Sequence, residues 1–210
     1  SRWGRQIRYK NITYAILYWW RVLLWGEKYK EKVYVVDHGR ISTPLHQSIL
    51  YALEMIEEGL SANEIKLKLE QAKQKMAIFI AVDDLKYLRR GGRISSGAAV
   101  AGQILNIKPI LSLDIGILEL YKKCRGLKKA KKTMIEDIKT ILSEQYSEEF
   151  KNGDIHLLAA SSADDETTQR WVQDIKEAFP GHEVMCDYLS FGVTCHTGPG
   201  ALGIGFSCRP

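Results

Sequence analysis

Residues 108–122 read KPILSLDIGILELYK, and this stretch decides the fold class. Two apolar runs, 108–114 and 117–122, stand on either side of Ile115-Gly116, a pair that lets the chain reverse its direction. We predict an antiparallel β-hairpin here. Elsewhere strand-like and helix-like segments alternate, and a hairpin within such a chain makes part of the sheet antiparallel. The sequence therefore predicts an α/β fold with a mixed sheet.

The segments around the hairpin follow the two periodicities of regular structure. Short apolar runs predict strands at residues 33–37, 77–82, 155–160 and 183–189. Apolar residues at helical spacing predict helices at residues 43–59, 61–76, 85–90, 95–105, 126–146 and 164–179. Ser61 and Glu64 have the spacing of a capping box at the start of the second helix. A boundary between two domains falls near residues 76–84.

Composition restricts the class of protein. Of the 210 residues, 45% are hydrophobic and 26% are charged, with a net charge of +5, which is typical of a globular protein. The four cysteines show no CxxC spacing, so we expect free thiols in a reducing cytoplasm and no metal site. Residues 15–25, AILYWWRVLLW, include Arg21 and are too short to span a membrane, so they predict a buried or half-buried helix.

Two stretches concentrate positive charge. Residues 85–96, LKYLRRGGRISS, place Arg89, Arg90 and Arg93 around two glycines just before a predicted helix start. This pattern suits a phosphate or carboxylate, and a solvated helix C-terminus is the alternative. Residues 122–132, KKCRGLKKAKK, hold seven basic side chains. They suit an anionic partner, with nucleic acid as one option, or form a plain solvated helix face.

Residues 196–200, HTGPG, combine a histidine with an open backbone after a strand-like apolar run. Glycines leave backbone amides unobstructed, so consecutive N–H groups can converge on an anion. His196 can donate a hydrogen bond to the same anion, and Thr197 adds a hydroxyl. The pattern fits a carboxylate or phosphate at the end of an apolar slot, and a turn with an incidental histidine is the alternative.

No catalytic constellation stands out. Asp37-His38 and Ser42 are the residue types of a triad, but they are neighbours in sequence, whereas triads are defined by geometry. Asp83-Asp84 suit a metal ion, but their place before a short predicted helix is better explained by helix capping. We therefore predict no catalytic residues and no metal ligands.

Taken in order, four stretches resemble the motifs of the DegV family: LKYLRRGGRIS, LNIKPILSLDIG, KKCRG and HTGPGALGIGF. VYVVD also looks like the family's V-x-V-(I/V)-D-S segment, and the resemblance covers residues 30–210. It implies two α/β domains that hold one long-chain fatty acid in a tunnel between them. We expect residues 1–80 to be the remainder of an incomplete N-terminal domain. Residues 81–210 would form a C-terminal domain with a mixed sheet and flanking helices.

The resemblance also implies a function without catalysis. Several family members are the acyl-carrying subunit of bacterial fatty acid kinase and present the carboxylate to a separate catalytic subunit, which makes an acyl phosphate. His196 matches the family's carboxylate-binding histidine, and Thr197, Gly198 and Ser1 are expected to complete the site. Arg93 and Arg125 match arginines implicated in kinase docking. The implied protein is a cytoplasmic monomer without a cofactor, touches membranes transiently and binds no nucleic acid.

The sequence departs from the family pattern at its start. The family's early Thr/Ser motif lies upstream of the first residue here, and Asp37 is followed by His38 where the family usually has serine. We expect the N-terminal part to be missing, as in a fragment, a truncated product or a divergent copy. Two other functions stay open: an enzyme using His196 as acid or base on a phosphorylated or carboxylated substrate, and a nucleic-acid or regulatory protein built on the lysine-rich helix.

Overall fold

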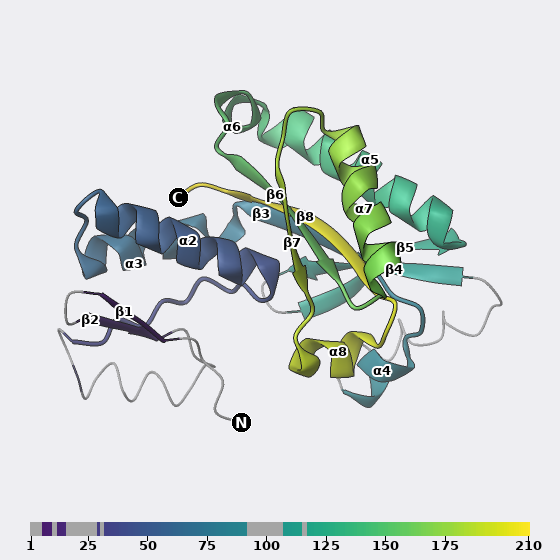
Figure 1. Cartoon of the computed structure of the whole chain (residues 1–210), viewed down its shortest axis with the longest axis horizontal. Coiled ribbons are helices and arrows are strands. Elements are labelled where there is room, and N and C mark those ends of the chain that lie inside the picture. Colours follow the sequence, from purple (N-terminus) through teal and green to yellow (C-terminus); the bar gives the residue numbers. More distant parts are fainter. Residues whose placement is uncertain (1–5, 10–11, 16–28, 30–31, 92–106, 115–116) are drawn as a thin grey trace. The chain divides into compact units, whose positions relative to one another are not determined.

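The computed structural model describes residues 6–9, 12–15, 29, 32–91, 107–114 and 117–210 (Figure 1). The chain divides into two compact units. The helical unit comprises Ser1–His38, Ser48–Lys73 and Pro210, and the sheet unit comprises Gly39–Gln47 and Gln74–Arg209. The division into domains at residues 80 and 81 stays a prediction. That position falls within the strand β3, which belongs to the sheet unit.

The sheet unit contains a six-stranded sheet with the order β5-β4-β3-β8-β6-β7. The strands are β3 (Met76–Ala81), β4 (Ile107–Asp114), β5 (Ile117–Arg125), β6 (Ile155–Ser161), β7 (Val184–Tyr188) and β8 (Leu202–Cys208). β6 and β7 are parallel, and the other neighbours in this sheet are antiparallel. β4 and β5 pair as the predicted hairpin, whose turn lies outside the described residues. The predicted α/β class with a mixed sheet is confirmed.

β8 lies in the centre of the sheet, and sequence analysis did not predict it. It pairs with β3 on one side and with β6 on the other, and all of its residues are buried. A Cβ added at Gly205 would lie less than 3.0 Å from the carbonyl oxygen of Ala77 in β3, so glycine is required there. Because glycine lowers strand propensity, this segment is a strand through its neighbours more than through its own residues.

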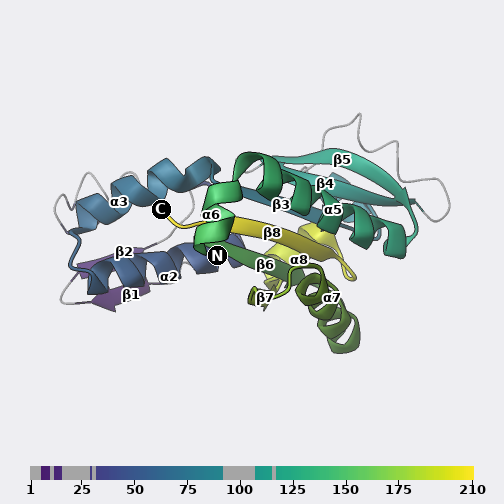
Figure 2. The ribbon, with the colours of Figure 1, turned by 90° about the horizontal axis from the view of Figure 1, so that it is seen from above.

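Helices cover the sheet of this unit. α5 (Leu127–Gln145), α6 (Ser147–Asn152) and α7 (Asp165–Ala178) lie on one face, toward the viewer in Figure 2. α4 (Lys86–Arg90) and α8 (Phe191–Thr197) lie on the other side (Figure 1). α4, α5 and α7 confirm predicted helices, whereas α6 was not predicted. The helix predicted at residues 95–105 lies outside the described residues.

Two apolar clusters hold the sheet unit together. Alternate residues of β3 point to opposite faces of the sheet, so Phe79 joins one cluster and Ile80 the other. The larger cluster includes Met134 of α5 and Trp171 of α7, both fully buried. The smaller cluster includes Leu88 of α4, which is also fully buried. The smaller cluster is the apolar surface beneath the candidate site.

The helical unit confirms two predicted helices. They are α2 (Thr43–Glu57), which begins in the sheet unit, and α3 (Ala62–Gln71), which is followed by the 3₁₀ turn η1 (Ala72–Gln74). Ser61 and Glu64 form the predicted capping box. The unit also contains an unpredicted hairpin, β1 (Gln6–Tyr9) with β2 (Ile12–Ala15). Ala15 ends β2, and the rest of the apolar segment at residues 15–25 lies outside the described residues.

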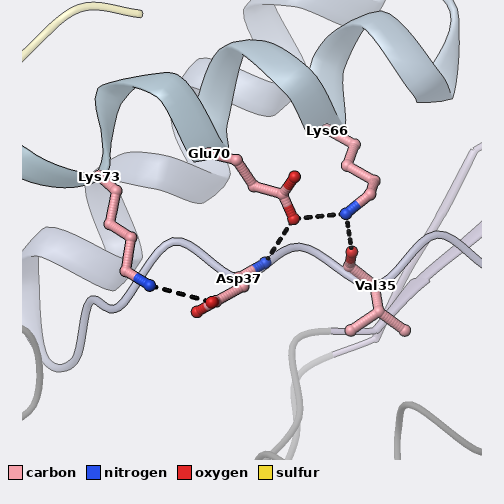
Figure 3. A network of polar contacts seen from close by, with 5 residues as sticks. All are labelled: Val35, Asp37, Lys66, Glu70 and Lys73. Carbon is pink, nitrogen blue, oxygen red and sulfur yellow. Dashed lines mark hydrogen bonds and ion pairs between the residues drawn. The ribbon is translucent and has the colours of Figure 1, made fainter.

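The strand predicted at residues 33–37 is wrong. Among the described residues this segment pairs with no strand, and side chains of the helix α3 and the turn η1 bind it instead (Figure 3). Lys66 donates to the carbonyl of Val35 over 2.7 Å, and the amide of Asp37 donates to Glu70 over 2.9 Å. The ammonium of Lys73 lies 2.9 Å from the Asp37 carboxylate. The β-branched residues favour a strand, but these polar contacts take the place of a neighbouring strand.

The close approach of β8 to β3 gives a test of the sheet. We expect Gly205→Ala to lower the free energy of unfolding by about 1–3 kcal/mol, because the new methyl group meets a backbone carbonyl that cannot move aside alone. Gly203→Ala in the same strand is the matched control, since its Cβ would meet its nearest neighbour at 3.5 Å, an ordinary contact. Urea unfolding measures both; equal losses would contradict the assigned register.

Candidate functional site

Three segments meet at one end of the sheet. Ala81, the last residue of β3, pairs with Leu202, the first residue of β8, which also pairs with Ser161 at the end of β6. α4 follows β3, α8 precedes β8, and Ser162 follows β6. The register of the sheet therefore brings together segments that are far apart in sequence, and the predicted HTGPG segment lies among them.

His196 lies in the last turn of α8, so the interpretation of the preceding apolar run as strand-like is wrong. The amides of Val193 and Thr194 both donate to the carbonyl of Ser190 over 2.9 Å, and this begins the helix. Gly198 ends it with a φ of +80°, a conformation that favours glycine. The histidine is therefore held by a hydrogen-bonded helical turn.

α4 packs against this segment (Figure 1), and a glycine stands on one side of each close contact. A Cβ on Gly200 would lie 3.1 Å from the carboxylate of Asp83, and one on Gly198 would lie 2.5 Å from the ring of Tyr87. A Cβ on Gly91 would meet the imidazole of His196, at 2.8 Å from Cε1. The absence of side chains at these glycines lets the two segments approach closely.

One ring nitrogen of His196 is buried in this contact. Its Nδ1 has no hydrogen-bond partner among the residues that the structure describes. The side chain as a whole is partly exposed. Buried polar atoms are usually hydrogen-bonded, so an atom without a partner requires an explanation in the function or in the neighbouring residues.

Polar groups close to His196 in sequence already form hydrogen bonds within the chain. The Thr197 hydroxyl is buried and lies 3.3 Å from the carbonyl oxygen of Gly198 and 3.4 Å from that of Val193. Both distances are long for a hydroxyl donor, so this bonding is weak. The Gly198 amide donates to Thr194 over 2.8 Å, and the Gly200 amide donates to Ser162 over 3.1 Å. These two amides therefore do not form the open anion nest that the glycines suggested.

Ser162 is a structural residue of the site that sequence reasoning missed. Its hydroxyl donates to the carbonyl of Gly198 over 2.7 Å and accepts from the amide of Ala201 over 3.0 Å. Its own amide donates to the Ala201 carbonyl over 2.9 Å. The available signal was a polar residue directly after a buried strand, where a loop at the sheet end needs hydrogen-bond partners.

The second basic stretch is only partly neutralised. Lys122 lies 2.8 Å from Asp137, Lys132 lies 3.6 Å from Glu136, and Lys131 pairs with Asp174. Of the seven basic residues in this stretch, the other four are exposed and have no ion pair within the described part of the chain: Lys123, Arg125, Lys128 and Lys129. We call these four residues the basic patch. They lie at the end of β5 and in the first turn of α5, which contains no acidic residue.

The basic patch is built around a glycine. Gly126 joins β5 to α5 with φ +78° and ψ 156°, a backbone conformation open to glycine alone. Placing lysines at the N-terminus of a helix is unfavourable, because the helix dipole already makes that end positive. The patch is therefore suited to an anionic partner. Arg89 and Arg90 of the other basic stretch are exposed at the end of α4, and Arg93 and Ser1 lie outside the described residues.

Asp84 bonds the backbone at the start of α4, although the N-cap of that helix is Leu85. Its carboxylate accepts from the Lys86 amide over 2.7 Å. Partial burial would raise the pKa of Asp84, but hydrogen bonds and the charge of Lys86 outweigh it and lower that pKa. Asp83 lies 2.6 Å from the ammonium of Lys108. Over the described ranges, no cluster of three or more His, Cys, Asp or Glu residues is arranged to hold a metal ion. Within those ranges, no helix has the length and apolar character to cross a membrane.

Comparison with solved structures finds the same fold. A fatty-acid-binding DegV family protein from Thermus thermophilus superposes with a TM-score of 0.76 at 27% identity, covering 89% of this chain and 64% of that one. A stearic-acid-binding protein from Eubacterium ventriosum gives a TM-score of 0.74 at 24% identity, covering 89% and 63%. The second likeness concerns the fold alone.

Comparison by sequence agrees. A DegV domain-containing protein of Streptococcus pyogenes serotype M6 is 31% identical over 91% of this chain and 66% of its own length. Protein DegV of Bacillus subtilis is 33% identical over 74% of this chain and 53% of its own length. The chain thus spans about half to two thirds of these relatives. The family model described as "Uncharacterised protein, DegV family" matches residues 22–209. The resemblance noted in the sequence is confirmed, and the chain belongs to the DegV family.

Proposed function

We propose that the protein binds a long-chain fatty acid, with His196 as the main carboxylate ligand, and presents it to a fatty acid kinase. The observation that carries this proposal is the partly buried imidazole of His196, one nitrogen of which is enclosed by the chain. Three residues before it and five after it in sequence, Val193 and Ala201 pack in the smaller apolar cluster. A fatty acid has one anionic end and a long apolar body, so it needs one anchor beside an apolar surface.

The neighbouring residues take different parts in this proposal. The Thr197 hydroxyl is only weakly bonded at 3.3–3.4 Å, so it can turn to a carboxylate, which accepts stronger hydrogen bonds. The amide of Gly198 is engaged at 2.8 Å, so its contribution is the turn that places Thr197 and His196. Ser1 completes the proposed ligand set. The Thermus thermophilus relative is described as a fatty-acid-binding protein, which supports the same ligand class.

The kinase part of the proposal rests on the basic patch. Arg125 is exposed beside Lys123, Lys128 and Lys129 and has no ion pair in the described part of the chain, so it is free to meet an acidic partner surface. Arg93 is the second proposed docking residue. We propose that the chain itself is a cytoplasmic monomer that carries out no catalysis and needs no cofactor. Its partners would be the acyl chain, the kinase subunit and, transiently, a membrane surface, and would not include nucleic acid.

The first test concerns the ligand. We expect His196→Ala to weaken fatty-acid affinity by about tenfold or more, the effect of losing one hydrogen bond to a charged group. Competition with a fluorescent fatty acid measures it. His182→Ala is the matched control, since that ring stacks on Phe150 at 4.3 Å outside the site. Native mass spectrometry of the purified protein should also detect a bound fatty acid. Unchanged affinity in the His196 variant, or no binding by the wild type, would overturn the proposal.

The second test concerns docking. We expect Arg125→Ala to keep fatty-acid affinity and to lower kcat/KM for phosphorylation by the kinase subunit by about tenfold, equivalent to about 1.4 kcal/mol. Arg93→Ala should act in the same direction. Lys176→Ala is the control, because Lys176 is an exposed cation on α7 outside the basic patch. Equal rates for the wild type and the Arg125 variant would remove the docking role.

A further inference from the structure

The contact between α4 and the HTGPG segment has a regular spacing. Asp83 lies three residues before α4, Tyr87 lies within α4, and Gly91 is its C-cap. They face Gly200, Gly198 and His196 respectively. Two of these contacts set a glycine of the HTGPG segment against a side chain of α4 or the residues before it. The third is reversed, because the glycine is Gly91 and the side chain is the imidazole of His196.

Gly91 is not required by its backbone conformation. Its φ of −79° and ψ of −4° are open to any residue. The requirement comes from His196, since a Cβ at position 91 would overlap Nδ1 and lie 2.8 Å from Cε1 and 3.3 Å from Cγ. The imidazole ring therefore rests directly on the bare Cα of Gly91. Any larger residue at this position displaces the ring.

The same contact distinguishes the two nitrogens of the ring. Nδ1 is enclosed against Gly91 and has no partner among the described residues. A proton on Nδ1 would be a buried donor without an acceptor, which is costly. In the neutral ring the proton therefore belongs on Nε2, the nitrogen left to meet a ligand.

We infer that Gly91 is a positioning residue for His196: its bare Cα seats the ring with Nδ1 enclosed, so that Nε2–H is the group offered to an anionic ligand. Tyr87 contacts both Gly91 and the turn that follows His196. Its carbonyl accepts from the Gly91 amide over 3.0 Å, and its ring packs against Gly198, which follows the histidine turn. The part of this inference that concerns a carboxylate ligand rests on the proposed function, whereas the seating of the ring does not.

The seat is tested first without any ligand. We expect Gly91→Ala to lower the melting temperature in the wild-type background and to lose this effect in the His196→Ala background, where the methyl group meets no ring. Gly192→Ala is the matched control in α8, because a Cβ there meets nothing within 4 Å. It should leave the melting temperature unchanged or raise it. An equal loss from Gly91→Ala in both backgrounds would overturn the inference.

The orientation of the ring is tested by nitrogen NMR. In protein labelled with ¹⁵N-histidine, the His196 signals are assigned by their loss in His196→Ala. We expect the neutral wild-type ring to show the Nε2–H tautomer, and Gly91→Ala to shift the signals toward a mixture of tautomers. The Nδ1–H tautomer in the wild type would contradict the inference, even if Gly91→Ala fails to fold.

The fatty-acid affinities of two His196 variants test the role of Nε2–H, and they also allow failure of this inference to be told apart from failure of the proposed function. His196→Gln places an amide donor near the position of Nε2, whereas His196→Asn places one near Nδ1. We expect the glutamine variant to keep part of the fatty-acid affinity and the asparagine variant to lose as much as His196→Ala. If the wild type binds no fatty acid, the proposed function fails, while the melting and NMR results still decide whether Gly91 seats the ring. Equal affinities of the glutamine and asparagine variants would contradict the role of Nε2–H.

Discussion

The pairing of β8 with both β3 and β6 is the constraint on which the sheet unit depends. β8 is the last strand in sequence, yet it lies between the β3-β4-β5 half and the β6-β7 half of the sheet. Without it the described sheet would divide in two. The same strand begins directly after the HTGPG segment, so the hydrogen bonds of β8 also fix where that segment lies. In this way one strand, through its two ladders, sets both the stability of the unit and the position of the candidate site.

The direction of the strands explains why α4 meets α8. Because β3 and β8 are antiparallel, the end of β3 lies beside the start of β8, where Ala81 pairs with Leu202. The segment leaving β3 and the segment entering β8 therefore share one end of the sheet. Ser162 arrives at the same end from β6 and closes the loop with hydrogen bonds to Gly198 and Ala201. The topology of the sheet brings these segments together, and their side chains then determine the contacts between them.

Local signals predicted most of the helices and strands, and failed where neighbours decide the structure. The capping box at Ser61 and the β4-β5 hairpin rest on contacts between residues close in sequence, which a sequence pattern can register. β8 contains two glycines and becomes a strand only because two partners enclose it. Residues 33–37 have the composition of a strand, but Lys66 and Glu70 take up backbone groups there that a ladder would otherwise bind. In both cases the deciding partner is distant in sequence.

The candidate site likewise combines a feature that a local motif predicts with a contact that depends on residues distant in sequence. His196 was predicted from its motif, whereas its contact with Gly91 depends on sheet register and could not be read from either residue alone. The two parts of the proposed function also differ in their electrostatics. A bond made at the partly buried imidazole is shielded from dissolved ions, while the exposed charges of the basic patch act through water that screens them beyond about 8 Å at physiological ionic strength. Under the proposed function, holding an acyl chain would depend on the geometry of the Gly91 seat, and meeting a partner would depend on exposed charges that salt screens, so each could vary in sequence without altering the other.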